Sequence, residues 1–218
     1  MQKQNNYLFF LFIIFITVNT HCIKNKTFTP KEGDLLFQDL DSSPLCDGIE
    51  KVTKSFQNNN FSHIGIVVLI KKKHYVLEAF TNGVDTVLLD VFLNRSLNSN
   101  KTPKVVVGRL QKNYTRVIPK AIEIGVEMIG KKYDAEFKLN NNKYYCSELI
   151  YDIFLLANNN HPVFELQPMT FKLNNSTLDV WVKYFQELGV QIPEKEPGIN
   201  PGSISLSKKI EIIHNYNQ

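Results

Sequence analysis

The sequence has 218 residues, of which 43% are apolar and 11% aromatic, and its formal net charge is +4 at pH 7. This apolar content is enough for a packed core and excludes a largely disordered chain, and the length fits about one compact domain. The charge is weak, and no Lys/Arg run is interleaved with aromatic residues. The composition therefore argues against a nucleic-acid partner.

The N-terminus is typical of a signal peptide. Residues 1–6 are polar, residues 7–18 (YLFFLFIIFITV) form a continuous apolar run, and polarity returns at residues 19–21. This run suits a signal-peptide core and is shorter than the ~20 residues that a membrane span needs. We therefore expect a signal peptide over residues 1–21, one domain over residues 22–218, and a secreted or exported protein without a stable membrane span. An uncleaved anchor, or a lipid attached to Cys22, stays open.

The remaining chain predicts an α+β fold, in which helices pack on an antiparallel sheet or a small barrel. The hairpin of strands 62–70 and 74–80 turns at the lysine triplet 71–73, which we expect to be a solvated tip. The clearest helix is Cys146–Ala157, because it has a broad apolar face. In chain order, strands are predicted at 34–37, 62–70, 74–80, 84–89 and 104–110, helices near 49–57 and at 118–129 and 146–157, a loop or short helix at 92–100, and a strand or helix at 178–187.

Two polar residues lie on the predicted hairpin. A two-residue turn at Lys71-Lys72 places Glu78 on the same face as His63, one diagonal step away and within side-chain reach. Glu78 follows apolar residues in its strand, where a carboxylate needs a partner. Gly65 follows His63 on its face and is expected to leave open space beside the imidazole. Each residue taken alone is more typical of a structural role.

Cys146 lies where a polar loop meets the start of the 146–157 helix. The positive end of the helix dipole and the unpaired N–H groups there favour a thiolate and can stabilise an oxyanion. Together, Cys146, His63 and Glu78 supply a nucleophile, a base and a group that orients the base. A buried structural cysteine is the alternative.

Several segments, in this order, resemble the permuted papain-like amidases of the NlpC/P60 superfamily, specifically the YaeF/YiiX-like group. They are Gly33–Phe37, Ser62–Val67, Val76–Ala79, Gly130–Asp134, Tyr144–Ile150 and Pro201–Ile204. The resemblance spans roughly residues 30–210. It implies that Cys146, His63 and Glu78 are catalytic, and Tyr145 and Ser147 flank the nucleophile. We add Ser62 to them as a candidate for substrate binding, whereas Asp34 is expected only to fix the turn into the first strand.

We therefore predict a secreted cysteine hydrolase that cleaves an amide bond in a peptide, a cell-wall-type peptide or an N-acyl compound. Acyl-ester or thioester hydrolysis, or acyl transfer on lipid, is the second interpretation, and an inactive secreted binding module is the third. A wide apolar groove beside Cys146 would favour lipid, and a narrow polar cleft would favour peptide. Segments 92–103 and 138–143 have no counterpart in the family pattern. The oligomeric state is not predicted.

Neither a cofactor nor a metal is expected. The histidines show no ligand spacing with cysteine or acidic residues, and no phosphate-binding glycine loop is present. The histidines are His21, His63, His74, His161 and His214.

The cysteines and the glycosylation sequons give information on the cellular compartment of the protein. In an oxidising compartment three cysteines leave one over, and a Cys22–Cys46 pair would leave Cys146 unpaired. The sequons favour a secretory route, although an Asn-rich composition raises their chance frequency. They begin at Asn25, Asn60, Asn94, Asn100, Asn113, Asn174 and Asn175.

Overall fold

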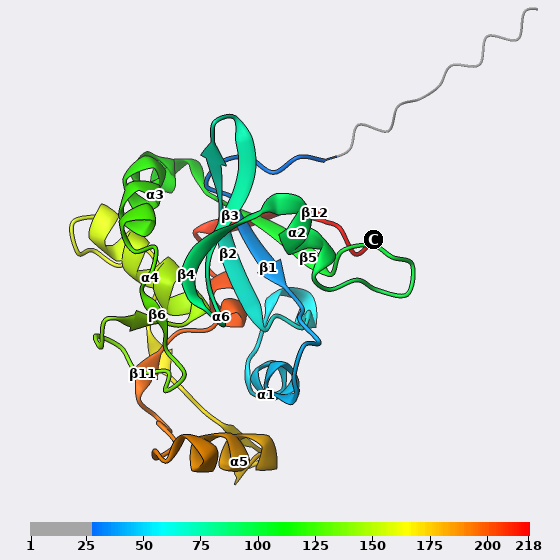
Figure 1. The fold of residues 1–218 in the computed structure, drawn as a ribbon, viewed down its shortest axis with the longest axis vertical. Helices are drawn as coiled ribbons and strands as arrows, with labels where there is room; N and C mark the ends of the chain where they lie inside the picture. The colour runs from blue at the N-terminus through cyan, green and yellow to red at the C-terminus, as the bar shows by residue number, and fades with distance from the viewer. Residues whose placement is uncertain (1–27) are drawn as a thin grey trace, which may run out of the picture.

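The computed structural model describes residues 28–218, so the expected signal peptide, Cys22 and the sequon at Asn25 lie outside the described residues. Its centre is a six-stranded antiparallel sheet of order β12-β5-β1-β2-β3-β4 (Figure 1). The strands are β1 (Leu35–Gln38), β2 (His63–Ile70), β3 (Lys73–Phe80), β4 (Gly83–Leu88), β5 (Val105–Leu110) and β12 (Ile210–Asn215). The sheet and its helices confirm the predicted α+β class.

Both faces of the sheet are buried, which explains why β2 is apolar almost throughout. Helices α3 (Ile118–Glu127) and α4 (Cys146–Ala157) lie to one side of the sheet, and α2 (Leu89–Asn94) lies to the other (Figure 1). On the α4 side, Ile64 and Ile66 join the main core, whereas Val67 and Val76 pack with α2 in a smaller cluster.

The helices α1 (Pro44–Val52) and α5 (Asp179–Leu188) lie towards the lower end of the molecule in Figure 1. There, α5 packs on α1 through Trp181, whose ring lies within 3.2 Å of the position that a Cβ on Gly48 would occupy. The remaining elements are η1 (Phe56–Asn58), η2 (Lys112–Val117), β6 (Lys132–Tyr133), β7 (Lys143–Tyr144), β8 (Gln167–Pro168), β9 (Lys172–Leu173), β10 (Ser176–Thr177), β11 (Pro197–Gly198) and α6 (Pro201–Ser205).

The hairpin of β2 and β3 has the register expected from its sequence. Lys71 and Lys72 both have positive φ, 50° and 65°, as a two-residue type I′ turn requires. This turn pairs Ile70 with Lys73 and sets the pairing of Ile66 with Leu77. Continued along the hairpin, the register puts His63 and Glu78 on one face of the sheet.

One predicted helix is wrong in position. The helix expected near 49–57 is α1, Pro44–Val52, because Pro44 suits the first turn of a helix and Thr53 is already extended. The segment 178–187 is the helix α5, and 92–100 begins with the last turn of α2. The closing strand β12 was not predicted. No helix within residues 28–218 has the length and apolarity needed to cross a membrane.

Asp34 has the structural role expected of it. Its buried carboxylate accepts a hydrogen bond from the Lys31 N–H at 2.7 Å and is held by Arg109 of β5 through two bonds of 2.7 and 2.8 Å. These bonds fix the turn that leads into β1.

Candidate active site

His63 and Glu78 meet on the face of the hairpin that carries α2. The Nε2 atom of His63 lies 2.6 Å from Oε2 of Glu78, and both side chains are buried. This bond fixes the plane of the imidazole and leaves Nδ1 as the nitrogen that is not engaged by the carboxylate.

The surroundings raise the pKa of His63 to about 9. Burial by itself opposes the charged ring, but the effects of the Cys146 thiol and of Glu78 outweigh it. Cys146 and Glu78 thus both favour the protonated ring, and direct contact between the thiol and the imidazole stays a prediction. At neutral pH the ring of His63 is positively charged.

Glu78 has a second partner that the sequence analysis did not find. Arg95, which directly follows α2, donates from Nη1 to Oε2 at 2.8 Å and from Nη2 to Oε1 at 2.6 Å. Burial alone raises the pKa of Glu78, but the hydrogen bonds from Arg95 and His63 lower it to about 2. The buried carboxylate is therefore ionised throughout the physiological range.

Gly65 differs from its expected role. A Cβ at this position would lie 2.4 Å from Cγ1 of Val76 and 3.5 Å from Cβ of Glu78. The space beside the imidazole is therefore not open. Glycine instead lets β3 approach closely enough for Glu78 to reach the ring.

Cys146 is the first residue of α4, with Tyr145 as the N-cap residue. The Sγ atom thus lies at the positive end of the helix dipole. Within the same turn, the Glu148 carboxyl accepts the Tyr145 N–H at 3.3 Å, and burial raises the pKa of Glu148 to about 8. Glu148 is therefore mostly neutral at pH 7 and places little negative charge near the sulfur.

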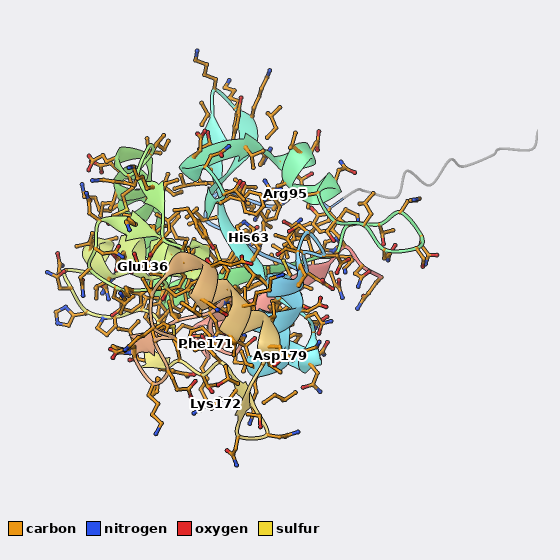
Figure 2. All side chains as sticks on the ribbon, turned by 60° about the horizontal axis from the view of Figure 1, so that its bottom comes forward. His63, Arg95, Glu136, Phe171, Lys172 and Asp179 are labelled. Atoms are coloured by element: carbon orange, nitrogen blue, oxygen red, sulfur yellow. The ribbon has the colours of Figure 1, made fainter. Side chains whose placement is uncertain are left out.

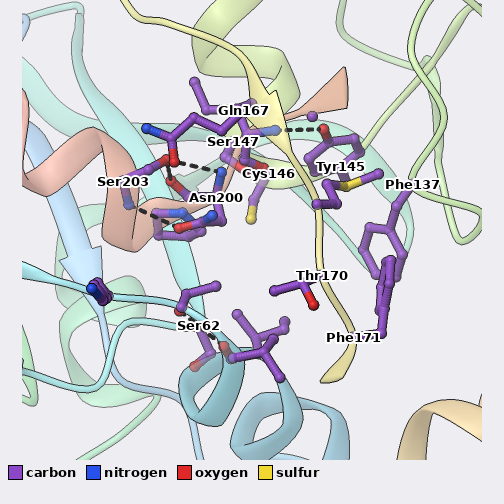
Figure 3. Close-up of a pocket in the computed structure, with 18 of the residues that line it drawn as sticks. Ser62, Phe137, Tyr145, Cys146, Ser147, Gln167, Thr170, Phe171, Asn200 and Ser203 are labelled. Carbon is purple, nitrogen blue, oxygen red and sulfur yellow. Dashed lines mark hydrogen bonds between the residues drawn. The ribbon is translucent and has the colours of Figure 1, made fainter. Parts of the chain in front are cut away.

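A cavity of about 380 Å³ opens beside Cys146 (Figure 3). Cys146 is only 6% exposed, but it lines this cavity and is not sealed in the core. The cavity walls are mostly apolar and aromatic, and Lys54 is the one charged residue among them. The apolar and aromatic lining residues are Ile49, Val52, Tyr133, Phe137, Tyr145, Pro168, Met169, Phe171, Trp181, Ile199, Pro201 and Leu206.

The three residues predicted to bind substrate, Ser62, Tyr145 and Ser147, all line this cavity. Their hydroxyl groups bond to the main chain: Ser147 donates to the Ile199 carbonyl at 2.9 Å, and Tyr145 accepts the Ile199 N–H at 3.3 Å. Ser62 accepts the Leu40 N–H at 2.9 Å. These bonds attach the start of α4 and the start of β2 to neighbouring segments. Contact of the three side chains with substrate stays a prediction.

The loop after β6 supplies another wall. The buried Asp134 carboxylate accepts the N–H groups of Glu136 at 3.0 Å and Lys138 at 2.7 Å. The turn places Phe137 at a φ of 55° in the lining of the cavity, and Tyr133 lines it from the strand itself. Burial raises the pKa of Tyr133 well above its usual value, so its hydroxyl stays protonated.

Figure 2 shows His63 and Arg95 near one another in the middle of the molecule, with Phe171 towards its lower part. Sequence reasoning found His63 but missed Arg95 and the apolar wall of Met169, Phe171 and Trp181. A buried glutamate requires a cationic partner, which was the signal for Arg95, but the sequence did not say which cation meets it. Cys46 is buried, and because Cys22 lies outside residues 28–218, their pairing stays a prediction.

Comparison with known proteins supports the resemblance seen in the sequence. A sequence profile for the family described as permuted papain-like amidase enzyme, YaeF/YiiX, C92 family, matches residues 29–214. The uncharacterized protein YiiX of Escherichia coli K12 is 25% identical over 175 residues, which are 80% of this chain and 81% of that protein. The crystal structure of the metalloprotein yiiX from Escherichia coli O157:H7 has a TM-score of 0.68 at 24% identity, and the match covers 86% of this chain and 98% of that one.

Proposed function

The chain belongs to the permuted papain-like amidase family, YaeF/YiiX, C92, and from this premise we propose that it is a secreted or exported cysteine hydrolase with Cys146 as nucleophile, His63 as base and Glu78 as the residue that orients His63. The proposed reaction is hydrolysis of an amide bond whose acyl side carries an apolar group. The observation that carries the proposal is a buried imidazole that bonds Glu78 through Nε2, with the Cys146 thiol at the N-terminus of α4 among the groups that raise the pKa of the ring.

In the first step, the Cys146 sulfur attacks the substrate carbonyl. The proton of the thiol is held on His63, at the nitrogen not bonded to Glu78, and N–H groups at the start of α4 stabilise the negative oxygen that develops. When the C–N bond breaks, the imidazolium gives its proton to the departing amine. The acyl group remains on Cys146 as a thioester.

In the second step, water attacks the thioester and transfers a proton to His63. The C–S bond breaks, the carboxylic acid leaves, and the thiol and imidazole return to their first state. Glu78 exchanges no proton in either step, because its pKa of about 2 keeps it ionised. Its part is to hold the ring and to stabilise the imidazolium.

The cavity supports an apolar acyl group over a polar peptide. Its volume falls within the roughly 300–1,000 Å³ of small-molecule sites, and its single charged lining residue is a lysine at an exposed position. A peptide with charged side chains would leave those charges without partners there. An N-acyl compound whose chain enters the cavity fits the lining better.

Ester or thioester hydrolysis, or transfer of the acyl group to another acceptor, is the second candidate, and the same apolar wall favours it. The thioester on Cys146 is common to all these reactions. They differ in the leaving group and in the molecule that accepts the acyl group. An inactive binding module is the non-enzymatic alternative, and the intact set of Cys146, His63 and Glu78 counts against it.

The E. coli O157:H7 relative is described as a metalloprotein. Within residues 28–218, no group of three or more His, Cys, Asp or Glu side chains lies close enough to hold a metal ion. The Glu78 oxygens are already taken by Arg95 and His63. The described residues therefore do not fit a metal centre, and the proposal assigns no step to one.

The test is a panel of matched substrates. Octanoyl amides, esters and thioesters, and a charged dipeptide amide, are incubated with the protein and with Cys146→Ala, and the acyl-enzyme is sought by mass spectrometry. We expect amide hydrolysis, an octanoyl adduct on Cys146, and a loss of about 10³-fold or more in Cys146→Ala. Ester or thioester turnover without amide turnover favours the second candidate. Absence of any adduct or turnover contradicts an enzymatic role.

Secretion has its own test. Every sequon asparagine among the described residues is solvent-exposed, so the folded surface can accommodate glycans there. Expression with the native N-terminus in a eukaryotic secretory host should give protein in the medium whose apparent mass falls on treatment with an N-glycosidase. Retention in the cytosol without glycans would contradict the proposed export.

A further inference from the structure

We propose that Arg95 is a positioning residue of this active site, which acts through Glu78 to hold the imidazole of His63 in the correct orientation. The inference rests on the proposed function. It assigns a role to a residue in segment 92–103, which has no counterpart in the family pattern quoted above. Three observations support it: the pairing with Glu78, the contacts with rings that surround His63, and the charges that face the carboxylate.

The pairing is a two-pronged ion pair. The two terminal nitrogens of Arg95 each donate to a different oxygen of Glu78, at 2.8 and 2.6 Å. This fork geometry fixes the plane of the carboxylate, which a single bond from lysine would leave free to rotate. Because Oε2 also bonds Nε2 of His63 at 2.6 Å, the plane that Arg95 sets determines where the imidazole lies.

The guanidinium is itself held in place by aromatic rings. Its central carbon lies 4.3 Å from the centre of the Phe80 ring and 5.3 Å from that of Phe92. The same two rings contact the imidazole of His63, with centroid distances of 5.1 Å for Phe80 and 5.8 Å for Phe92. Arg95 and His63 thus share the same aromatic surroundings.

The position of Arg95 depends on α2. The backbone N–H of Arg95 donates to the Phe92 carbonyl at 3.3 Å, and the same carbonyl accepts a hydrogen bond from Nε2 of Gln38 at 2.7 Å. Gln38 is the cross-strand partner of His63 in the sheet. These bonds attach the end of α2 to the strand pair that carries His63. The guanidinium of Arg95, which follows α2, is thereby placed beside Glu78 of β3.

The charges that face Glu78 come from three elements. His63 approaches from β2, Arg95 follows α2, and Asp85 is the directly opposite residue on β4. Cys146 of α4 acts on the cluster through the imidazole. Arg95 is the only one of these groups that is positively charged at every relevant pH, so it keeps the carboxylate ionised whether or not the ring carries a proton.

The test compares Arg95→Met with Arg95→Lys, using octanoyl amide hydrolysis over pH 5–10. Arg109→Met is the matched control, because Arg109 makes the same two-pronged pair with Asp34 away from the site. We expect Arg95→Met to lower kcat about 10–30-fold with KM changed less than twofold, and to move the alkaline limb of kcat to higher pH, because the imidazolium loses a nearby cation that opposes its charge. Arg95→Lys should recover part of kcat, and Arg109→Met should lower Tm without moving the pH profile.

Chemical rescue gives a readout that a purely structural role would not move. Because the Arg95 side chain is 19% exposed, ethylguanidinium added to Arg95→Gly should enter from solvent and raise kcat at least threefold. It should have no such effect on Arg109→Gly. If both Arg95 variants keep the wild-type kcat and pH profile and lose only thermal stability, the proposal is overturned. Failure of the wild-type protein to turn over any substrate overturns the proposed function instead.

Discussion

The charged cluster of His63, Glu78 and Arg95 is centred on a regular β-hairpin, whereas the cavity beside Cys146 is walled by residues from the helices α1, α4, α5 and α6, from two-residue strands and from the connections between them. In the hairpin, a slip of one residue would turn Glu78 to the opposite face, so the register and the chemistry are fixed together. Around the cavity, Met169 and Phe171 lie in the connection between β8 and β9. We therefore expect substitutions in this wall to alter substrate choice and to leave the charged cluster unchanged.

Removing the charge of Glu78 should have the largest effect on the cluster. In Glu78→Gln the side chain keeps its shape, but His63 loses its anionic partner and the partly buried Arg95 loses its own. We expect kcat/KM to fall about 10²-fold, the scale of a general acid–base contribution, measured on the octanoyl amide. Asp85→Asn is the matched control, because Asp85 is the exposed residue opposite Glu78. Equal losses in the two variants would contradict a specific role for Glu78.

The pH profile should show the state of His63 directly. Its pKa is raised to about 9, so the imidazolium is present below this pH and is lost as pH rises through it. Since the departing amine takes its proton from the ring, kcat for the amide should fall about tenfold per pH unit above pH 9. Glu78→Gln removes a group that raises this pKa and should therefore move the limb to lower pH. An alkaline limb that does not move in Glu78→Gln would contradict the claim that Glu78 raises the pKa of His63.

Changes in the cavity should affect substrate choice and leave the chemistry intact. Met169 is half-buried in the wall, and Met169→Ala removes about three heavy atoms of apolar contact, on the order of 1–2 kcal/mol. We expect KM for the octanoyl amide to rise about fivefold or more, with KM for the acetyl amide and the labelling rate of Cys146 unchanged. Val182→Ala, on the exposed face of α5, is the control. A lower kcat for both the octanoyl and the acetyl amide would show that Met169 affects the reaction itself and would contradict a role in acyl-chain binding alone.

The smallest effect on activity is expected at Asp34, far from the reaction but important for the fold. Asp34→Asn should lower the free energy of unfolding by about 2 kcal/mol, since a buried charged pair with Arg109 is broken, and Tm by roughly 4–8 °C. Breaking the exposed Lys120–Glu123 pair should change Tm by no more than about 1 °C. Thermal unfolding followed by circular dichroism measures both. An unchanged Tm for Asp34→Asn would contradict a stabilising role for the Asp34–Arg109 pair.

The parts of the fold that follow a local pattern could be predicted. Strand alternation and the paired lysines located the β2–β3 hairpin and its register, and the apolar face of 146–157 located α4. The helix α1 was displaced because the role of Pro44 as a start signal was not used, and β12 was missed at the end of the chain. The first error comes from a local signal, whereas β12 depends on pairing with the distant strand β5.

Part of the candidate site's geometry could also be predicted. The pairing of His63 with Glu78 followed from hairpin parity, and the place of Cys146 at a helix start followed from the apolar face of 146–157. Their catalytic roles rest on the family resemblance and stay a prediction. Arg95 could not be identified, because nothing in the sequence near it shows that the end of α2 meets β3. The apolar wall was also out of reach, since Met169, Phe171 and Trp181 meet only after α5 packs on α1. The lining of the cavity therefore became visible only in the structure.

The central claim is that His63, held by Glu78, activates the Cys146 thiol. The most direct measurement is the rate at which iodoacetamide labels Cys146 from pH 4 to 10 in the folded protein, read by peptide mass spectrometry with glutathione as reference. We expect Cys146 to react at pH 6 at least tenfold faster than glutathione, and His63→Ala to remove most of this advantage while the protein stays folded. Labelling that follows the glutathione profile, or that is the same in His63→Ala, would contradict the account.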